Sequence, residues 1–254
     1  MKKILALAAI AAFSLAAGSA QAGSHTLKIG TEGAYPPFNN LTADGKLVGF
    51  DIDIAKALCA EMKVECTFVT QDWDGIIPAL QAGKFDAIIA SMSITDERKK
   101  KVDFTDKYYN TPPAVAVRKD SDLTMGNFAD KAIGAQASTT HSNYAEATWT
   151  DADVRLYPTA DEYKLDLSNG RLDAVVDDVT VLQEWIESDD GACCKILGTI
   201  KPVPEIHGLG AGIAVRKGET ELTEKFNAAI QAIRANGTYK TINDKYFTFD
   251  AYGG

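Results

Sequence analysis

The sequence predicts an α/β protein built from two lobes, each with a parallel sheet, that two crossings of the chain join. Apolar runs of strand length alternate with amphipathic helices, which favours parallel strands covered by helices on both faces. A nine-residue segment that starts at Gly83 recurs without gaps at Gly170, so the pattern occurs once in each half. The adjacent prolines Pro112 and Pro113 separate the halves and favour an extended crossing.

The composition is that of a globular protein with enough residues for two domains. The chain has 254 residues, of which 24% are charged and 46% hydrophobic. Its net charge of −9 argues against nucleic-acid and anionic-membrane partners, because both rely on clustered Lys and Arg, and the dense basic run is confined to 98–101.

Residues 1–22 have the pattern of a secretory signal peptide. Lys2 and Lys3 precede an apolar run, and Ala20-Gln21-Ala22 matches a small-residue cleavage site. Cleavage after Ala22 changes the charge from −9 to −11 and places the mature chain in an oxidising compartment. No later apolar stretch approaches membrane-spanning length.

The four cysteines fit such a compartment. Cys59 and Cys66 lie seven positions apart, at a predicted helix end and strand start, and suit a local disulfide. Cys193 and Cys194 are adjacent, which leaves two alternatives, a strained vicinal bond or two free thiols. Zinc is not expected, because the cysteines form no C-x-x-C pair with spaced histidines.

The first half is predicted to alternate strands and helices up to residue 109. Glycine and Pro36-Pro37 disfavour regular structure after the first strand, so Glu32 and Tyr35 fall on a loop at its carboxyl end. Pro78 is tolerated only near the first turns of its helix. The predicted strands cover 26–30, 46–48, 66–70 and 84–90, and the predicted helices cover 50–62 and 73–81.

The internal repeat divides the chain. Segment 83–91 aligns with 170–178, and a weaker similarity pairs 29–32 with 133–136. We interpret 26–109 plus 209–254 as lobe 1 and 113–204 as lobe 2, with hinges near 110–112 and 205–208. A strand at 211–215 and helices at 221–236 and 239–249 return the chain to lobe 1. Chance similarity between two buried strands is the alternative.

The segment from Ser91 to Arg98 is the first candidate binding site. Ser91 and Ser93 lie on one side of an extended chain, and Thr95 can cap the helix that follows. Free N–H groups at a helix start and the planar guanidinium of Arg98 both suit a carboxylate. A capped surface helix with a solvated arginine is the competing interpretation.

The repeat places Asp178 where the first half has Ser91. If the lobes face each other, one side offers Arg98 to an anion and the other offers a carboxylate to a cation, which together match an amino-acid zwitterion. Asp178 can instead cap the helix that begins near Val179. Thr139 and Thr140, in the first loop of lobe 2, are further candidate donors to a ligand carboxylate.

Three residues of the first half are candidates for contact with a ligand side chain. Tyr35 and Trp73 lie at strand ends and can enclose an aliphatic or cationic group, although core packing explains Trp73 equally well. Glu32 can pair with a basic terminus, or remain solvated on its loop.

Catalysis has little support in the sequence. His25, His141 and His207 have no G-x-S-x-G motif or metal-spaced partner, and no phosphate-binding glycine motif follows a strand. We therefore expect no metal, cofactor or catalytic residue.

The chain resembles the periplasmic solute-binding proteins of ABC importers for polar amino acids, especially the lysine/arginine/ornithine- and histidine-binding group. The resemblance extends over 26–252. The segments that carry it are 31–38, 49–55, Trp73-Asp74-Gly75-Ile76-Ile77-Pro78, Ser91-Met92-Ser93-Ile94-Thr95-Asp96-Glu97-Arg98, 170–174, 237–239 and 245–247.

The resemblance implies a two-lobe binding protein of type II, a monomer that closes on an amino acid in the periplasm and docks on an inner-membrane permease. It implies no enzymatic activity. Opine binding and a periplasmic dehydratase on the same fold are the alternatives. The roles it implies are a carboxylate site at Ser91, Ser93, Arg98 and Thr140, an amine site at Asp178, an aromatic clamp at Tyr35 and Trp73, an acidic selectivity residue at Glu32, and a disulfide between Cys59 and Cys66.

Overall fold

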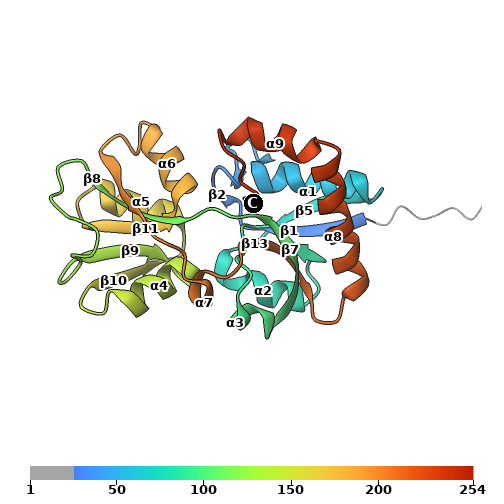
Figure 1. Ribbon diagram of the computed structural model, residues 1–254, viewed down its shortest axis with the longest axis horizontal. Coiled ribbons are helices and arrows are strands. Elements are labelled where there is room, and N and C mark those ends of the chain that lie inside the picture. Colours follow the sequence, from blue (N-terminus) through green and yellow to red (C-terminus); the bar gives the residue numbers. More distant parts are fainter. Residues whose placement is uncertain (1–25, 254) are drawn as a thin grey trace, which may run out of the picture.

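The computed structural model describes residues 26–253, and the predicted signal peptide lies outside them. Two α/β lobes lie side by side, each around a five-stranded sheet (Figure 1). The strand orders are β5-β1-β6-β13-β7 in lobe 1 and β10-β9-β11-β8-β12 in lobe 2. The two-lobe α/β class predicted from the sequence is confirmed.

Four of the five strands in the large sheet of lobe 1 come from the first half of the chain, and the fifth, β13, comes from near its end. Its strands are β1 Thr26–Thr31, β5 Glu65–Thr70, β6 Ala87–Ile88, β7 Val102–Tyr109 and β13 Ala211–Arg216. A small sheet adds β2 Ala34–Tyr35, β3 Asn39–Leu41 and β4 Leu47–Val48. Its helices are α1 Phe50–Glu61, α2 Trp73–Gln81, α3 Asp96–Lys99, α8 Thr220–Ala235 and α9 Thr238–Tyr246.

Lobe 2 repeats the arrangement with a contiguous stretch of chain. Its strands are β8 Pro113–Arg118, β9 Ala132–Gln136, β10 Asp153–Tyr157, β11 Ala174–Asp178 and β12 Cys194–Thr199. Its helices are α4 Thr140–Thr148, α5 Ala160–Ser168 and α6 Val179–Glu187, and the short α7 Pro204–His207 lies on the return crossing. Figure 1 shows the two crossings running between the lobes.

The internal repeat corresponds to equivalent strands of the two sheets. β1 pairs in parallel with β5 and β6, and β9 pairs in parallel with β10 and β11. At the equivalent positions Gly30 and Gly134, an added Cβ would lie 2.5 Å from Phe85 and from Leu172. Glycine at both positions therefore lets an equivalent large side chain cross the strand, which explains why this part of the pattern occurs twice.

Antiparallel strands complete both sheets at the side where the chain crosses. β13 runs antiparallel to β6 and β7, and β8 runs antiparallel to β11 and β12. β8 follows the first crossing, at 110–112, and β13 follows the return crossing, so in each sheet the strand that breaks the parallel order comes directly after a crossing. The carboxyl ends of β1, β6, β9 and β11 thus face the space between the lobes.

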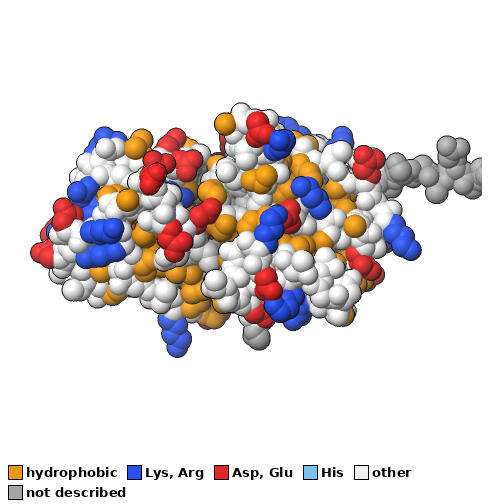
Figure 2. All heavy atoms as spheres, turned by 90° about the horizontal axis from the view of Figure 1, so that it is seen from above, with side chains coloured by type: hydrophobic (Ala, Val, Ile, Leu, Met, Phe, Trp, Pro, Cys, Tyr) orange, Lys and Arg blue, Asp and Glu red, His pale blue; other side chains and the backbone are white. Residues whose placement is uncertain are grey.

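The four cysteines form two disulfides, and charged side chains of both signs lie on the surface. Cys59 and Cys66 are disulfide-bonded, with their Cα atoms 6.1 Å apart, and Cys193 is bonded to Cys194. Acidic and basic side chains are interspersed over both lobes on the face in Figure 2. Within residues 26–253 no helix is both long and apolar enough to cross a membrane.

Candidate functional site

A cavity between the lobes brings together seven of the eight predicted ligand-binding residues. They are Glu32, Tyr35, Trp73, Ser91, Ser93 and Arg98 from lobe 1 and Thr140 from lobe 2. Lobe 2 also contributes Thr139, a further candidate donor from the sequence, and Gln136 and His141, which were not predicted as ligand-binding residues. The space measures about 30 Å³, room for only one or two water molecules. An amino acid therefore requires the lobes to move apart before it can enter.

Arg98 lies in α3, the short helix that Thr95 caps by accepting a hydrogen bond from the Arg98 N–H. Its guanidinium donates from Nη1 to the Ser93 carbonyl at 3.0 Å and from Nη2 to the Ser138 carbonyl at 3.1 Å. Within residues 26–253 no carboxylate lies within ion-pair distance of it. Burial lowers the pKa of Arg98 to about 10, which still leaves it charged at neutral pH. The guanidinium is thus a partly buried cation available to an anion.

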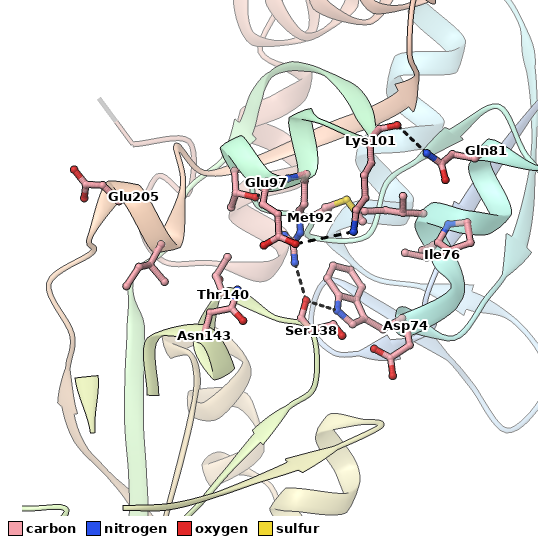
Figure 3. A pocket seen from close by; sticks show the side chains of 16 residues that line it. Asp74, Ile76, Gln81, Met92, Glu97, Lys101, Ser138, Thr140, Asn143 and Glu205 are labelled. Atoms are coloured by element: carbon pink, nitrogen blue, oxygen red, sulfur yellow. Dashed lines mark hydrogen bonds and ion pairs between the residues drawn. The ribbon is translucent and has the colours of Figure 1, made fainter. Parts of the chain in front are cut away.

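The Ser138 carbonyl connects Arg98 and Trp73 across the lobe boundary. The indole Nε1 of Trp73 donates to the same carbonyl at 3.2 Å, and the guanidinium carbon lies 5.1 Å from the indole ring centroid. Figure 3 shows Ser138 of lobe 2 reaching these lobe 1 side chains. A larger cleft of about 580 Å³ lies beside this contact and shares Trp73, Arg98 and Thr140 with the smaller cavity.

Glu32 follows the end of β1 and meets Gln136 at the end of β9. The Gln136 side-chain amide donates to Glu32 Oε1 at 2.6 Å and to the Pro158 carbonyl at 3.0 Å. Burial, opposed by this hydrogen bond, raises the pKa of Glu32 to about 7. No cation in the described part of the chain pairs with Glu32, so its carboxylate faces the cavity without a counter-charge.

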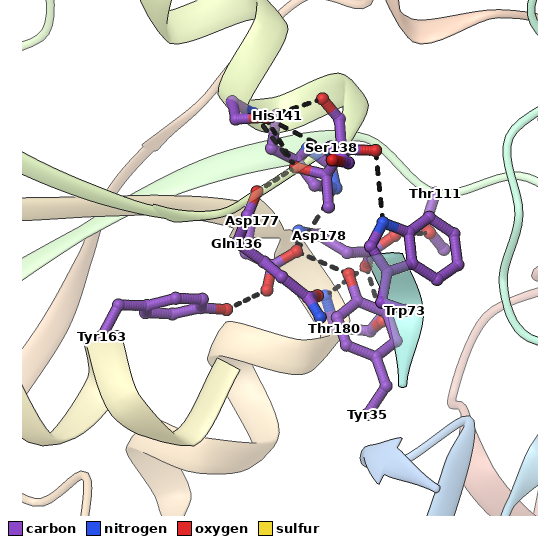
Figure 4. Close-up of polar contacts among 12 residues, drawn as sticks. Tyr35, Trp73, Thr111, Gln136, Ser138, His141, Tyr163, Asp177, Asp178 and Thr180 are labelled. Atoms are coloured by element: carbon purple, nitrogen blue, oxygen red, sulfur yellow. Dashed lines mark hydrogen bonds and ion pairs between the residues drawn. The ribbon is translucent and has the colours of Figure 1, made fainter. Parts of the chain in front are cut away.

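Tyr35 contributes its ring to the cavity and its hydroxyl to lobe 2. The ring stacks on Phe38, with centroids 5.9 Å apart, and the hydroxyl donates to Asp177 Oδ1 at 2.5 Å (Figure 4). Burial raises the pKa of the Tyr35 hydroxyl well above its ordinary value, so the group is a donor at neutral pH. Asp177 itself is 2% exposed, because β11 is central in its sheet.

Asp178 occupies the helix-capping position that the sequence left open as an alternative. It accepts hydrogen bonds from the backbone N–H and the hydroxyl of Thr180 at the start of α6, and from Thr111 on the first crossing. Burial raises its pKa. Asp178 is not among the residues that line the cavity, so its predicted amine contact remains a prediction.

The predicted hydroxyl groups have different environments. Ser91 has a φ of 56° and donates from its hydroxyl to Asp51 at 2.9 Å, while Ser93 presents its carbonyl to Arg98. Thr140 begins α4, whose capping box is formed by Thr139 and Ser142. Thr140 and His141, the first two residues of α4, therefore both line the cavity.

Several residues of this site were missed from the sequence. The weak repeat that pairs 29–32 with 133–136 aligns Glu32 with Gln136 and was the available signal for Gln136. Nothing in the pattern marked Ser138 or His141, because one acts through its backbone and the other is a single histidine. No metal-binding cluster of His, Cys, Asp and Glu occurs within residues 26–253.

The fold and this cavity define a two-lobe binding protein that closes around a small charged molecule. A family model for bacterial extracellular solute-binding proteins, family 3, matches residues 27–249. The chain is a member of this family.

Similar proteins are binding proteins for basic amino acids. The L-arginine-binding protein of Pseudomonas aeruginosa is 47% identical over all of this chain and 99% of its own length. The histidine-binding periplasmic protein of Salmonella typhimurium is 38% identical, with both chains fully covered. A solved Salmonella typhimurium periplasmic binding protein of high arginine specificity is 36% identical with a TM-score of 0.82, over 88% of this chain and 99% of that one.

Proposed function

We propose that this protein is a periplasmic receptor that captures a basic L-amino acid by lobe closure and delivers it to an ABC importer. One observation carries the proposal: within residues 26–253, the same interlobe cavity is lined by Arg98 without a carboxylate partner and by Glu32 without a cation partner. A ligand that bears both an anion and a cation satisfies both groups. Tyr35 and Trp73 supply apolar walls for the carbon chain between those charges.

The proposed roles follow from these contacts. Arg98 binds the α-carboxylate with help from Ser91, Ser93 and Thr140, and Glu32 pairs with the cationic side chain. Asp178 attracts the α-ammonium group from its capping position. The protein acts as a monomer, because one chain supplies both sides of the cavity.

Closure follows from the position of the groups. Arg98 and Glu32 belong to lobe 1, and the groups they contact, Ser138 and Gln136, belong to lobe 2. A ligand that enters between them contacts both lobes and therefore binds the closed form more tightly than the open form. That difference in affinity drives closure and gives the permease a surface that depends on the bound ligand.

Isothermal titration tests the ligand class. Arginine comes first, since the 47% identical relative is named for it, followed by lysine, ornithine and histidine. The protein is unfolded and refolded first to remove any bound amino acid. Saturable binding of at least one of the four supports the proposal, and heat signals indistinguishable from buffer for all four overturn it.

The cleft beside Arg98 favours a second candidate ligand class. Its volume of about 580 Å³ adjoins the smaller cavity at Trp73, Arg98 and Thr140. A bulky arginine derivative such as an opine can place its additional arm there. Tighter binding of an arginine-derived opine than of arginine in the same titration would favour this class over the simple amino acids.

A further inference from the structure

Asp177 is a buried carboxylate to which the proposed ligand contacts assign no role. It lies on β11, the central strand of lobe 2, and is 2% exposed. Its two oxygens accept hydrogen bonds from the hydroxyls of Tyr35 and Tyr163 and from the backbone N–H of Asp178, and His141 Nε2 lies 3.3 Å from Oδ1. A buried carboxylate with several donors is held as an acceptor in one orientation.

These partners divide between the lobes. Tyr163 on α5, His141 on α4 and the Asp178 N–H all belong to lobe 2, so they remain in place whatever the lobes do. Tyr35 on β2 belongs to the small sheet, whose other strands pack against α1 of lobe 1. The bond of 2.5 Å from Tyr35 to Asp177 therefore breaks when the lobes separate, while the other three persist.

The hydroxyl bond also determines where the Tyr35 ring lies. The ring is a wall of the ligand cavity and rests on Phe38, which is fully buried in the lobe 1 core. Stacking restrains one face of the ring, and the bond from the hydroxyl, which lies on the long axis of the side chain, fixes the direction in which the ring points. Figure 4 shows the tyrosine reaching towards the aspartate pair, beside Trp73.

We propose that Asp177 is a positioning residue for closure: on lobe 2 it captures the Tyr35 hydroxyl of lobe 1, which holds the lobes together and fixes the aromatic wall over the ligand. His141 and the Asp178 N–H lie at Oδ1, the oxygen that Tyr35 reaches, and orient it in advance, while Tyr163 bonds to the other oxygen. The ligand contacts proposed above then form in a cavity whose wall is already positioned. The lobe-holding part is independent of which ligand binds, while the effect on affinity rests on the proposed function.

The structure supplies a matched pair of variants. Tyr35→Phe and Tyr163→Phe each delete one hydroxyl donor from the same carboxylate, the first between lobes and the second within lobe 2. The ratio of closed to open molecules is counted by single-molecule energy transfer between dyes on the two lobes, first without amino acid and then with arginine. Arginine dissociation is followed by stopped flow.

Tyr35→Phe removes a hydrogen bond to a charged group. Its loss is expected to lower the closed-to-open ratio about tenfold and to raise the arginine dissociation rate by a similar factor. Tyr163→Phe leaves both within about twofold of wild type and lowers only the melting temperature. Equal effects of the two variants, or an unchanged ratio in Tyr35→Phe, overturn the proposal.

Asp177→Asn completes a double-mutant cycle with Tyr35→Phe. If the carboxylate acts through Tyr35, the double variant is no more open than the more open single variant. Additive effects overturn the proposal. Should Asp177→Asn not fold, the tyrosine pair still decides the question. If no amino acid increases the closed population although the tyrosine variants differ without ligand, the proposed ligand class fails and the role of Asp177 stands.

Discussion

Glu32 and Gln136, which occupy equivalent positions of the internal repeat, are hydrogen-bonded to each other across the lobes at 2.6 Å. Glu32 follows β1 and Gln136 ends β9, which are equivalent strands of the two lobes, so the similarity of the lobes brings the two side chains face to face. Glu32 is an acid and Gln136 its neutral counterpart, and within residues 26–253 no cation forms an ion pair with the Glu32 carboxylate.

Replacement of Arg98 tests the carboxylate site. Arg98→Ala removes a partly buried guanidinium that can make two charge-assisted hydrogen bonds, so arginine binding is expected to weaken at least about 100-fold. Arg98→Lys keeps the charge and loses the planar geometry, so its affinity for arginine should lie between those of the wild type and Arg98→Ala. Titration calorimetry measures both, with the exposed Arg171→Ala as control. Unchanged affinity in Arg98→Ala would place the carboxylate elsewhere.

The raised pKa of Glu32 predicts pH-dependent binding. The pKa of Glu32 in the folded protein is about 7, above the ordinary 4.5, so folding favours the protonated carboxyl group. The stability that the protonated group contributes is fully present below pH 4.5 and is lost as the pH rises through 7. A cationic ligand binds the ionised form, so it displaces a proton below pH 7. Arginine is expected to bind about 30-fold more weakly at pH 5.5 than at pH 8.

The pH experiment has a direct control. Glu32→Gln should weaken arginine binding at pH 8 and remove its dependence on pH, whereas Glu65→Gln at the exposed start of β5 should change neither. Titrations in buffers of different ionisation enthalpy count the released protons. A pH dependence that survives in Glu32→Gln would assign the titration to another group.

The disulfide between Cys59 and Cys66 joins the end of α1 to β5. Its sequence separation of seven predicts that Cys59→Ser with Cys66→Ser lowers the free energy of unfolding by about 2–3 kcal/mol. Urea denaturation followed by circular dichroism measures this. The bond between Cys193 and Cys194 closes almost no loop, so the paired Cys193→Ser and Cys194→Ser variant should lower the free energy of unfolding by less. An equal loss in both variants would contradict the loop-entropy explanation.

Gly208 allows the return crossing to pass close to lobe 1. Its φ is 75°, and an added Cβ would lie 2.2 Å from the Ile94 carbonyl oxygen. Gly45 has a similar φ of 77° with nothing within 4 Å. Gly45→Ala should therefore lower the free energy of unfolding by about 1 kcal/mol through the backbone alone. Gly208→Ala should cost at least about twice as much. Similar melting temperatures for the two variants would show that the crossing yields without strain.

The sequence alone predicts much of the architecture, because local patterns carry it. The helix at Trp73–Gln81 begins and ends where expected, and the repeat at 83–91 and 170–178 corresponds to equivalent central strands. The strand expected over 84–90 is shorter, only Ala87–Ile88, because only this part pairs with β1 and β13.

The sequence by itself determined the two-lobe α/β class, the family and the residues on the lobe 1 wall of the cavity, since strand ends and helix starts can be recognised from spacing. Only the tertiary structure decided which groups meet between the lobes. It buried Asp177 against Tyr35 and placed the Ser138 carbonyl on Arg98. Such contacts join residues far apart in the chain and depend on the relative position of two lobes, which no local pattern encodes.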